Sequence, residues 1–159
     1  MLFAQRSPRF WTRLLAGVFL TACLPTAAWA LSVPEKPEGR IHDRAGLLSR
    51  SARQALESRL ALFEQQTSNQ VVVAIFPSLE GGSIEDFSIR LAEKWKFGTA
   101  KNDNGVILLI FPDDRAVRIE VGYGLEGVLT DAVCAQIIRE RITPAFRKGD
   151  FDTGVASGI

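Results

Sequence analysis

The stretch 102–131, NDNGVILLIFPDDRAVRIEVGYGLEGVLTD, decides the fold of this chain. Residues 107–111 form a continuous apolar run of strand length, which indicates a central strand buried on both faces. Residues 117–122 alternate apolar and polar side chains, which indicates a half-buried strand. Residues 112–115 between them predict a tight turn. The two strands should therefore pair as an antiparallel hairpin.

Upstream of the hairpin, a second apolar run and a helical stripe predict a parallel strand pair. Residues 71–76 are apolar and mostly β-branched, and residues 84–95 follow with apolar positions at helical spacing after Ser83, a good N-cap. A strand, helix and strand in this order form a crossover unit. We expect three further helices, capped by Ser49 or Ser51, by Thr130 and by Asp150. The residues thus predict an α/β fold with a small mixed sheet.

The first 30 residues have the pattern of a secretory signal peptide. Three arginines precede the apolar run 14–20, and Ala28-Trp29-Ala30 offers a small-x-small cleavage site. Lipidation of Cys23 is the alternative, and we favour cleavage after Ala30. We therefore expect an exported protein, periplasmic or membrane-associated, with a proline-rich linker at 31–39 and one domain at 40–159.

Cleavage would change the charge balance of the protein. The whole chain has 19 Lys and Arg against 18 Asp and Glu; the signal contains three of the arginines and no acid, so 16 basic residues would remain, a net charge near −2. No basic stripe is left, which argues against nucleic-acid binding. Cys134 would be the only cysteine of the cleaved chain, which excludes an internal disulfide.

Residues 122–127, GYGLEG, match the G-x-G-x-x-G pattern of dinucleotide-binding loops. The preceding strand belongs to a hairpin, no later strand supplies a ribose-binding acid, and Glu126 would repel a pyrophosphate. We therefore expect no nucleotide cofactor, and we expect the glycines to permit positive φ angles at a sharp corner. His42, the only histidine, and Cys134 have no partners for nucleophilic catalysis in the sequence.

Acidic and amide side chains flank the hairpin. Asp103 and Asn104 precede its first strand, and Glu126 and Asp131 follow its second, so all four should lie at one edge of the sheet. Asp43, in an upstream turn, is expected beside them. Such hard oxygen donors suit Ca²⁺ or Mg²⁺ rather than zinc. The alternatives are structural, because Asp131 can stabilise a helix start, Asp103-Asn104-Gly105 can form a simple turn, and Asp43 can form an Asx turn.

Five segments in order resemble the TPM domain, which is named for thylakoid-lumen, photosystem-II-associated and levamisole-receptor-modulator proteins and is also called a TPM phosphatase domain. The resemblance covers about residues 38–159. The five segments are IHDRAGLL at 41–48, DNGV at 103–106, VGYGLE at 121–126, LTD at 129–131 and PAFRKGDF at 144–151.

This resemblance implies a three-layer α/β/α sandwich with a small mixed sheet. It also implies export or membrane anchoring, often with a later membrane span or Gly-rich tail, and we expect such a tail to be missing here because the last helix is short. It further implies a divalent-cation site, and acid phosphatase activity is reported for some plant members. The ligands that it implies are Asp43, Asp103, Glu126 and Asp131, with Asn104 close by.

Two functions follow from this expected site. The first is a divalent-cation-binding envelope module, Ca²⁺ being favoured over Mg²⁺, which supports complexes of an unidentified envelope or membrane protein. The alternative is a metal-assisted acid phosphatase that hydrolyses phosphomonoesters. We favour the module because no nucleophile or general base accompanies the acids.

Overall fold

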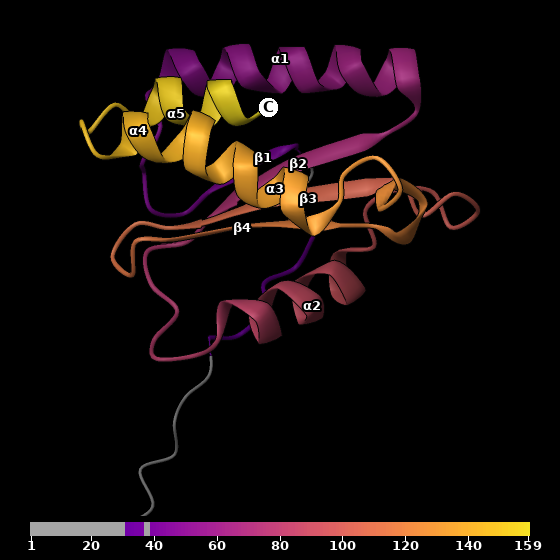
Figure 1. The fold of residues 1–159 in the computed structure, drawn as a ribbon, viewed down its shortest axis with the longest axis horizontal. Helices are drawn as coiled ribbons and strands as arrows, with labels where there is room; N and C mark the ends of the chain where they lie inside the picture. The colour runs from indigo at the N-terminus through magenta and orange to yellow at the C-terminus, as the bar shows by residue number, and fades with distance from the viewer. Residues whose placement is uncertain (1–30, 37–38) are drawn as a thin grey trace, which may run out of the picture.

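The fold is built on a four-stranded mixed sheet, seen in a computed structural model that describes residues 31–36 and 39–159 (Figure 1). The expected signal peptide lies outside these residues. The strand order is β1-β2-β3-β4. The first three strands are parallel, and β4 pairs with β3 as the predicted antiparallel hairpin. The strands are β1 (Ile41–Asp43), β2 (Gln70–Ile75), β3 (Gly105–Phe111) and β4 (Ala116–Val121).

Helices cover both faces of the sheet, which makes three layers (Figure 1). Of the helices in the described residues, one face carries only α2 (Ile84–Trp95). The opposite face carries the remaining α-helices: α1 (Arg50–Thr67), α3 (Asp131–Ile137), α4 (Thr143–Phe146) and α5 (Phe151–Gly158). A π-helical turn, η2 (Ile138–Ile142), joins α3 to α4, and a short 3₁₀ helix, η1 (Tyr123–Leu125), follows β4. The predicted sandwich is confirmed.

Alternation along the strands divides the core into two. Val73 and Leu108 face α1 and α5, whereas Val72 and Leu109 face α2, because successive side chains of a strand point to opposite faces. All seven residues of β3 are buried, as its apolar run predicts. Among residues 31–36 and 39–159, no helix combines the length and apolar character that a membrane crossing requires.

Side-chain caps set the helix starts that the sequence predicts. The Ser83 hydroxyl accepts a hydrogen bond from the Asp86 backbone N–H at 3.3 Å at the start of α2. Ser49, rather than Ser51, caps α1, because its hydroxyl accepts from the Ala52 N–H at 3.1 Å. The other two predicted caps, Thr130 and Asp150, accept from backbone N–H groups of α3 and α5.

The described part of the predicted linker, residues 31–36, lies along α2 and belongs to the packed structure. Leu31 and Val33 pack against the core on the α2 face. The Trp95 indole N–H donates to the Pro34 carbonyl at 2.9 Å, and the Lys94 ammonium donates to the Val33 carbonyl at 3.0 Å. This extended segment has no periodicity of its own, and its course is set by the packing of Leu31 and Val33 and by the donors on α2.

His42 lies in β1, half-buried between two aromatic rings. Its ring centroid is 5.4 Å from that of Phe76 and 5.3 Å from that of Trp95. Its Nε2 atom is buried and has no hydrogen-bond partner in the described structure. Burial, followed by the positive charges of Arg44 and Arg53, lowers the pKa of His42 below its ordinary value of 6.5. Protonation therefore favours the unfolded chain, in which this side chain is solvated.

We expect the free energy of unfolding to decrease as the pH falls below about 6.5, because the unfolded state then binds a proton that the folded state resists. The stability that neutral His42 contributes is fully present above the pKa that this residue has in the unfolded chain. It is lost as the pH falls toward the lower pKa that His42 has in the folded protein. Urea unfolding at several pH values between about 7.5 and 5.5 measures it. His42→Phe should flatten this dependence, since the chain has no other histidine. An unchanged slope in the variant would contradict the assignment.

Candidate functional site

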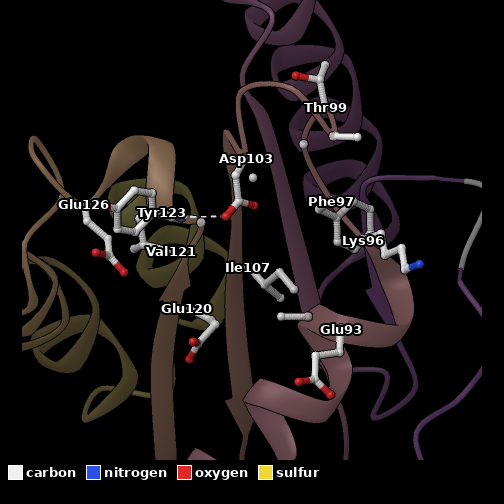
Figure 2. Close-up of a pocket in the computed structure, with 15 residues that line it drawn as sticks. Glu93, Lys96, Phe97, Thr99, Asp103, Ile107, Glu120, Val121, Tyr123 and Glu126 are labelled. Atoms are coloured by element: carbon white, nitrogen blue, oxygen red, sulfur yellow. Dashed lines mark hydrogen bonds between the residues drawn. The ribbon is translucent and has the colours of Figure 1, made fainter.

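The largest cavity described lies at the edge of the sheet where β3 begins and β4 ends (Figure 2). The hairpin brings these two ends together, with Val106 paired to Val121. The end of α2 meets the same edge, because a short loop connects it to the start of β3. The cavity has a volume of about 880 Å³, and its walls come from α2, the loop 96–103, the two strands and the corner around η1.

Acidic side chains dominate the lining of this cavity, which we call the acidic cavity. Four carboxylates line it, against a single cationic side chain, that of Lys96 (Figure 2). Glu120 is already engaged, since its Oε2 atom accepts from Arg118 Nε and from the Ser88 hydroxyl, both at 2.9 Å. The three other acids have no ion pair within the described residues: Glu93, Asp103 and Glu126.

Asp103 ties the loop before β3 to the corner after β4. Its Oδ2 atom accepts from the Tyr123 backbone N–H at 3.0 Å, drawn as a dashed line in Figure 2. Its backbone carbonyl accepts from the Gly124 N–H at 3.0 Å. The Asp103 backbone has a φ of 43°, a left-handed conformation that Asp and Asn adopt more readily than most residues. Among residues 31–36 and 39–159, the other carboxylate oxygen of Asp103 accepts no hydrogen bond.

Asp131 lies at the same edge of the sheet but lines an adjoining cavity of about 280 Å³. Glu120 and Glu126 line both cavities and so separate Asp103 from Asp131. Asp131 is the first residue of α3, where a carboxylate is favoured by the helix dipole. A structural role at the start of α3 therefore explains Asp131 no less well than a role as a metal ligand.

The expectation that Asp43 joins the other acids is wrong. Asp43 ends β1 and pairs with Ile75, which in turn pairs with Ile110, so it lies where β2 and β3 end. The acidic cavity lies where β3 begins. Because β1, β2 and β3 are parallel, a residue that ends β1 lies at the carboxyl ends of these strands. A residue that precedes β3 lies at their amino ends, on the opposite side of the sheet.

The Asp43 carboxylate instead orders the turn before α1. It accepts hydrogen bonds from the backbone N–H groups of Ala45 at 3.1 Å, Leu47 at 3.2 Å and Leu48 at 3.0 Å. This is the Asx-turn alternative that the sequence left open. The motif around Asp43 is thus explained by local backbone hydrogen bonding.

Asn104 is a buried clamp, with an exposed fraction of only 5%. Its Oδ1 atom accepts from the Thr99 backbone N–H at 2.9 Å. Its Nδ2 atom donates to the Ser68 carbonyl at 2.7 Å and to Asn69 Oδ1 at 3.1 Å. Both ends of the amide are therefore used to join the end of α1, the loop after α2 and the start of β3.

The remaining oxygen donors of the acidic cavity fit a divalent cation in their chemistry, because carboxylate and carbonyl oxygens are the ligands that Ca²⁺ prefers. Across residues 31–36 and 39–159, however, no group of three or more acidic, histidine or cysteine side chains converges on one point. Asp103 and Glu126 share one cavity. A cation bound there would be held by these two carboxylates, with backbone carbonyls and water completing its shell.

The glycines of the corner serve a purpose that differs from the predicted one. Gly122 has a φ of −68°, and neither Gly124 nor Gly127 has a positive φ. A Cβ atom on Gly122 would overlap the Asp103 carbonyl oxygen, and one on Gly124 would overlap the Asn102 carbonyl oxygen. These two glycines let the corner approach the loop before β3 closely. The explanation by positive φ is wrong for all three.

Sequence reasoning missed three of the residues that line the acidic cavity: Glu93, Lys96 and Glu120. Glu93 lies on the polar side of the α2 pattern, and Glu120 is on the polar side of the alternating strand β4. The short loop between α2 and β3 was the available signal, since it brings the end of the helix to the start of the strand.

Comparisons with known proteins agree with the observed fold. The family model of the TPM domain matches residues 41–159. The solution NMR structure of the N-terminal domain of a protein from P. gingivalis has 35% identity and a TM-score of 0.71, and the match covers 80% of this chain and 88% of that one. No curated protein matches this chain.

Two further NMR structures share the fold at lower identity. The N-terminal domain of the cg2496 protein from Corynebacterium glutamicum has 17% identity and a TM-score of 0.60, covering 82% of each chain. The BA42 protein from Bizionia argentinensis has 21% identity and a TM-score of 0.62, covering 73% of this chain and 79% of that one. The family model spans three-quarters of the sequence, and by that match this chain belongs to the TPM domain family.

Proposed function

We propose that this chain is a non-catalytic, exported envelope module that binds a divalent cation in the acidic cavity and supports complexes of a membrane-associated partner. One observation carries the proposal: the cavity is lined by four carboxylates and one lysine, and three of the carboxylates have no ion pair among the described residues. Unpaired carboxylates in a shared cavity raise the local affinity for cations. Ca²⁺ is favoured over Mg²⁺ because it accepts irregular sets of loop oxygens.

The composition of the same lining argues against catalysis. No serine, histidine or cysteine is among the residues that line the acidic cavity. The Ser88 hydroxyl is buried between Arg118 and Glu120 and cannot reach a substrate there. In a metal-assisted phosphatase the bound cation would supply part of the positive charge for the phosphate, and Lys96 is the only cationic residue among the described lining residues that could add to it. No observation on the described residues favours the phosphatase alternative.

An exposed apolar rim supports a docking role beside the cation. Tyr123, which lines the acidic cavity, is 80% exposed, and Val128, in the connection from η1 to α3, is 76% exposed. Tyrosine side chains are enriched among residues that anchor protein interfaces. Since Asp103 holds the Tyr123 backbone, a cation bound to Asp103 would also order the position of this side chain.

Isothermal titration of the purified protein with CaCl₂ and with MgCl₂ tests the proposal. We expect saturable Ca²⁺ binding, roughly tenfold weaker in Glu126→Gln, because removing one ligand charge weakens a carboxylate site. Asp103→Asn should have a similar effect, and it keeps both the left-handed backbone and an acceptor for the Tyr123 N–H. These variants alter charge with little change in shape.

Two aspartates that lie away from the acidic cavity, Asp113 and Asp43, provide the controls. Asp113→Asn, in the exposed β3–β4 turn, and Asp43→Asn should both bind Ca²⁺ as the unaltered protein does. The proposal fails if neither metal produces binding heat, or if Glu126→Gln binds Ca²⁺ with unchanged affinity. Loss of binding in Asp43→Asn with an unchanged melting temperature would place the site at the opposite edge.

A further inference from the structure

A second cavity lies at the end of the sheet opposite the acidic cavity. It has a volume of about 590 Å³, within the range of small-molecule sites, and it lies between the β3–β4 turn and the helices α4 and α5. Its wall is apolar, and the rings of Phe146 and Phe151 meet there edge to face with centroids 5.2 Å apart. Ile110 and Val117 of the hairpin supply the opposite part of this wall.

The polar part of this cavity is cationic. Arg115, from the β3–β4 turn, and Arg147, at the end of α4, both line it and are exposed. Neither guanidinium forms an ion pair or a side-chain hydrogen bond within the part of the chain that the structure describes. No acidic residue lines the cavity. Two guanidinium groups thus share an apolar cavity without a compensating charge.

Acids in the neighbouring turns are mostly engaged with backbone donors. Asp114 accepts from the Leu79 N–H at 2.6 Å, on the α2 side of the sheet. Asp152 accepts from the Ser49 N–H at 2.9 Å, and Asp150 caps α5. Asp113 is the remaining acid of the turn and is exposed. Within the described residues none of these acids forms an ion pair with Arg115 or Arg147, so the charge of the two arginines is available for an external anion.

Tight turns hold the backbones of both arginines in place. Arg115 has a φ of 52°, and its N–H donates to the Pro112 carbonyl at 3.2 Å. The Arg147 N–H donates to the Thr143 carbonyl at 3.0 Å, and the turn after it closes through the Asp150 N–H, which donates to the Ala145 carbonyl at 3.1 Å. Short, hydrogen-bonded turns reduce the conformational entropy lost when a ligand binds.

We propose that this cavity binds an amphiphilic anion, a carboxylate or phosphate monoester with an apolar chain or ring. The anionic group lies against Arg115 and Arg147, whose planar guanidinium groups match carboxylate and phosphate oxygens. The apolar part lies along Phe146 and Phe151. This site shares no residue with the acidic cavity, so it does not depend on the proposed function.

Probes that separate charge from apolar character test this site on the unaltered protein. Decyl phosphate and decanoate, used below their micelle concentrations, should shift amide signals of residues 110–117 and 143–151 in ¹H–¹⁵N spectra. Decyltrimethylammonium, which has the same chain and the opposite charge, should not. Inorganic phosphate should bind at least about tenfold more weakly than decyl phosphate, because it lacks the apolar part. Equal binding of the anionic and cationic amphiphiles, or of the two phosphates, would overturn the proposal.

A double variant tests the two arginines directly. Arg115→Asn with Arg147→Gln should weaken decyl phosphate binding at least about tenfold, since hydrogen bonds to charged groups are lost. Asparagine tolerates the positive φ at position 115, and a thermal melt checks that the variant folds. The matched control is Arg50→Gln at the exposed start of α1, which should bind normally. Normal binding by the double variant would exclude the arginines.

The same chemistry can come from a soluble metabolite or from a lipid headgroup. Sedimentation with phosphatidylcholine vesicles, with and without phosphatidylglycerol, distinguishes these sources. Retention on the anionic vesicles that the double variant loses assigns the cavity to a lipid. Binding of decyl phosphate without vesicle retention assigns it to a soluble anion. Both results support an amphiphilic anion, whereas failure of every anionic probe overturns it and leaves the acidic cavity unaffected.

Discussion

Replacing Asn104 with alanine is expected to lower the free energy of unfolding by about 3–4 kcal/mol, because several buried hydrogen bonds are lost at once. The side chain is buried and forms four hydrogen bonds. Alanine would leave the Thr99 N–H and the Ser68 carbonyl without this partner, and an unsatisfied buried polar group costs roughly 1–3 kcal/mol. Urea unfolding followed by circular dichroism measures the loss.

Asn102→Ala is the matched control for this substitution. Asn102 is exposed and lies two residues away, and its side chain forms no hydrogen bond among the described residues. We expect its effect to stay within about 0.5 kcal/mol. Unfolding measurements in excess chelator distinguish a structural role of Asn104 from a role as a metal ligand. The full loss in Asn104→Ala should persist without Ca²⁺, whereas a loss that appears only with Ca²⁺ would make Asn104 a ligand.

Gly124→Ala is expected to destabilise the protein by about 2–3 kcal/mol and to weaken Ca²⁺ binding. A Cβ atom at this position would overlap the Asn102 carbonyl oxygen, so η1 must move away from the loop before β3. The hydrogen bonds from Tyr123 and Gly124 to Asp103 would be stretched by this movement. Thermal unfolding and calcium titration of the same sample measure the two effects.

Gly127→Ala, three residues later, provides the comparison. Nothing lies within 4 Å of a Cβ atom built at this position, and its φ is not positive. We expect a neutral effect or a stabilisation of up to about 1 kcal/mol, through the loss of chain entropy in the unfolded state. If both alanine variants were equally destabilised, backbone conformation rather than close approach would explain the glycines.

Local patterns in the sequence predicted the elements of this fold well. The apolar run in β3 predicted a central strand buried on both faces, and the alternation in β4 predicted a half-buried strand; both are confirmed. Ser83, Thr130 and Asp150 were predicted as caps and form the expected hydrogen bonds. These signals depend on neighbours within a few residues, and so a single sequence is enough to interpret them.

The site was predicted less completely, because it depends on which ends of distant strands meet. Asp103, Glu126 and Asp131 share an edge, since a hairpin must return the chain to its start. Asp43 does not, because β1 pairs in parallel with β2, a direction that the three-residue strand could not reveal by its own pattern. Cation binding at the remaining acids stays a prediction.

The sequence by itself determined the order and type of the elements, the helix caps and the hairpin, because hydrophobic period and turn chemistry act over short distances. Only the tertiary structure decided the edge that Asp43 occupies, the burial of Asn104 and the close approach of Gly124 to Asn102. Each of these depends on the register of strands or on contacts between segments far apart in the chain. The same long-range packing placed Arg115 and Arg147 on one cavity.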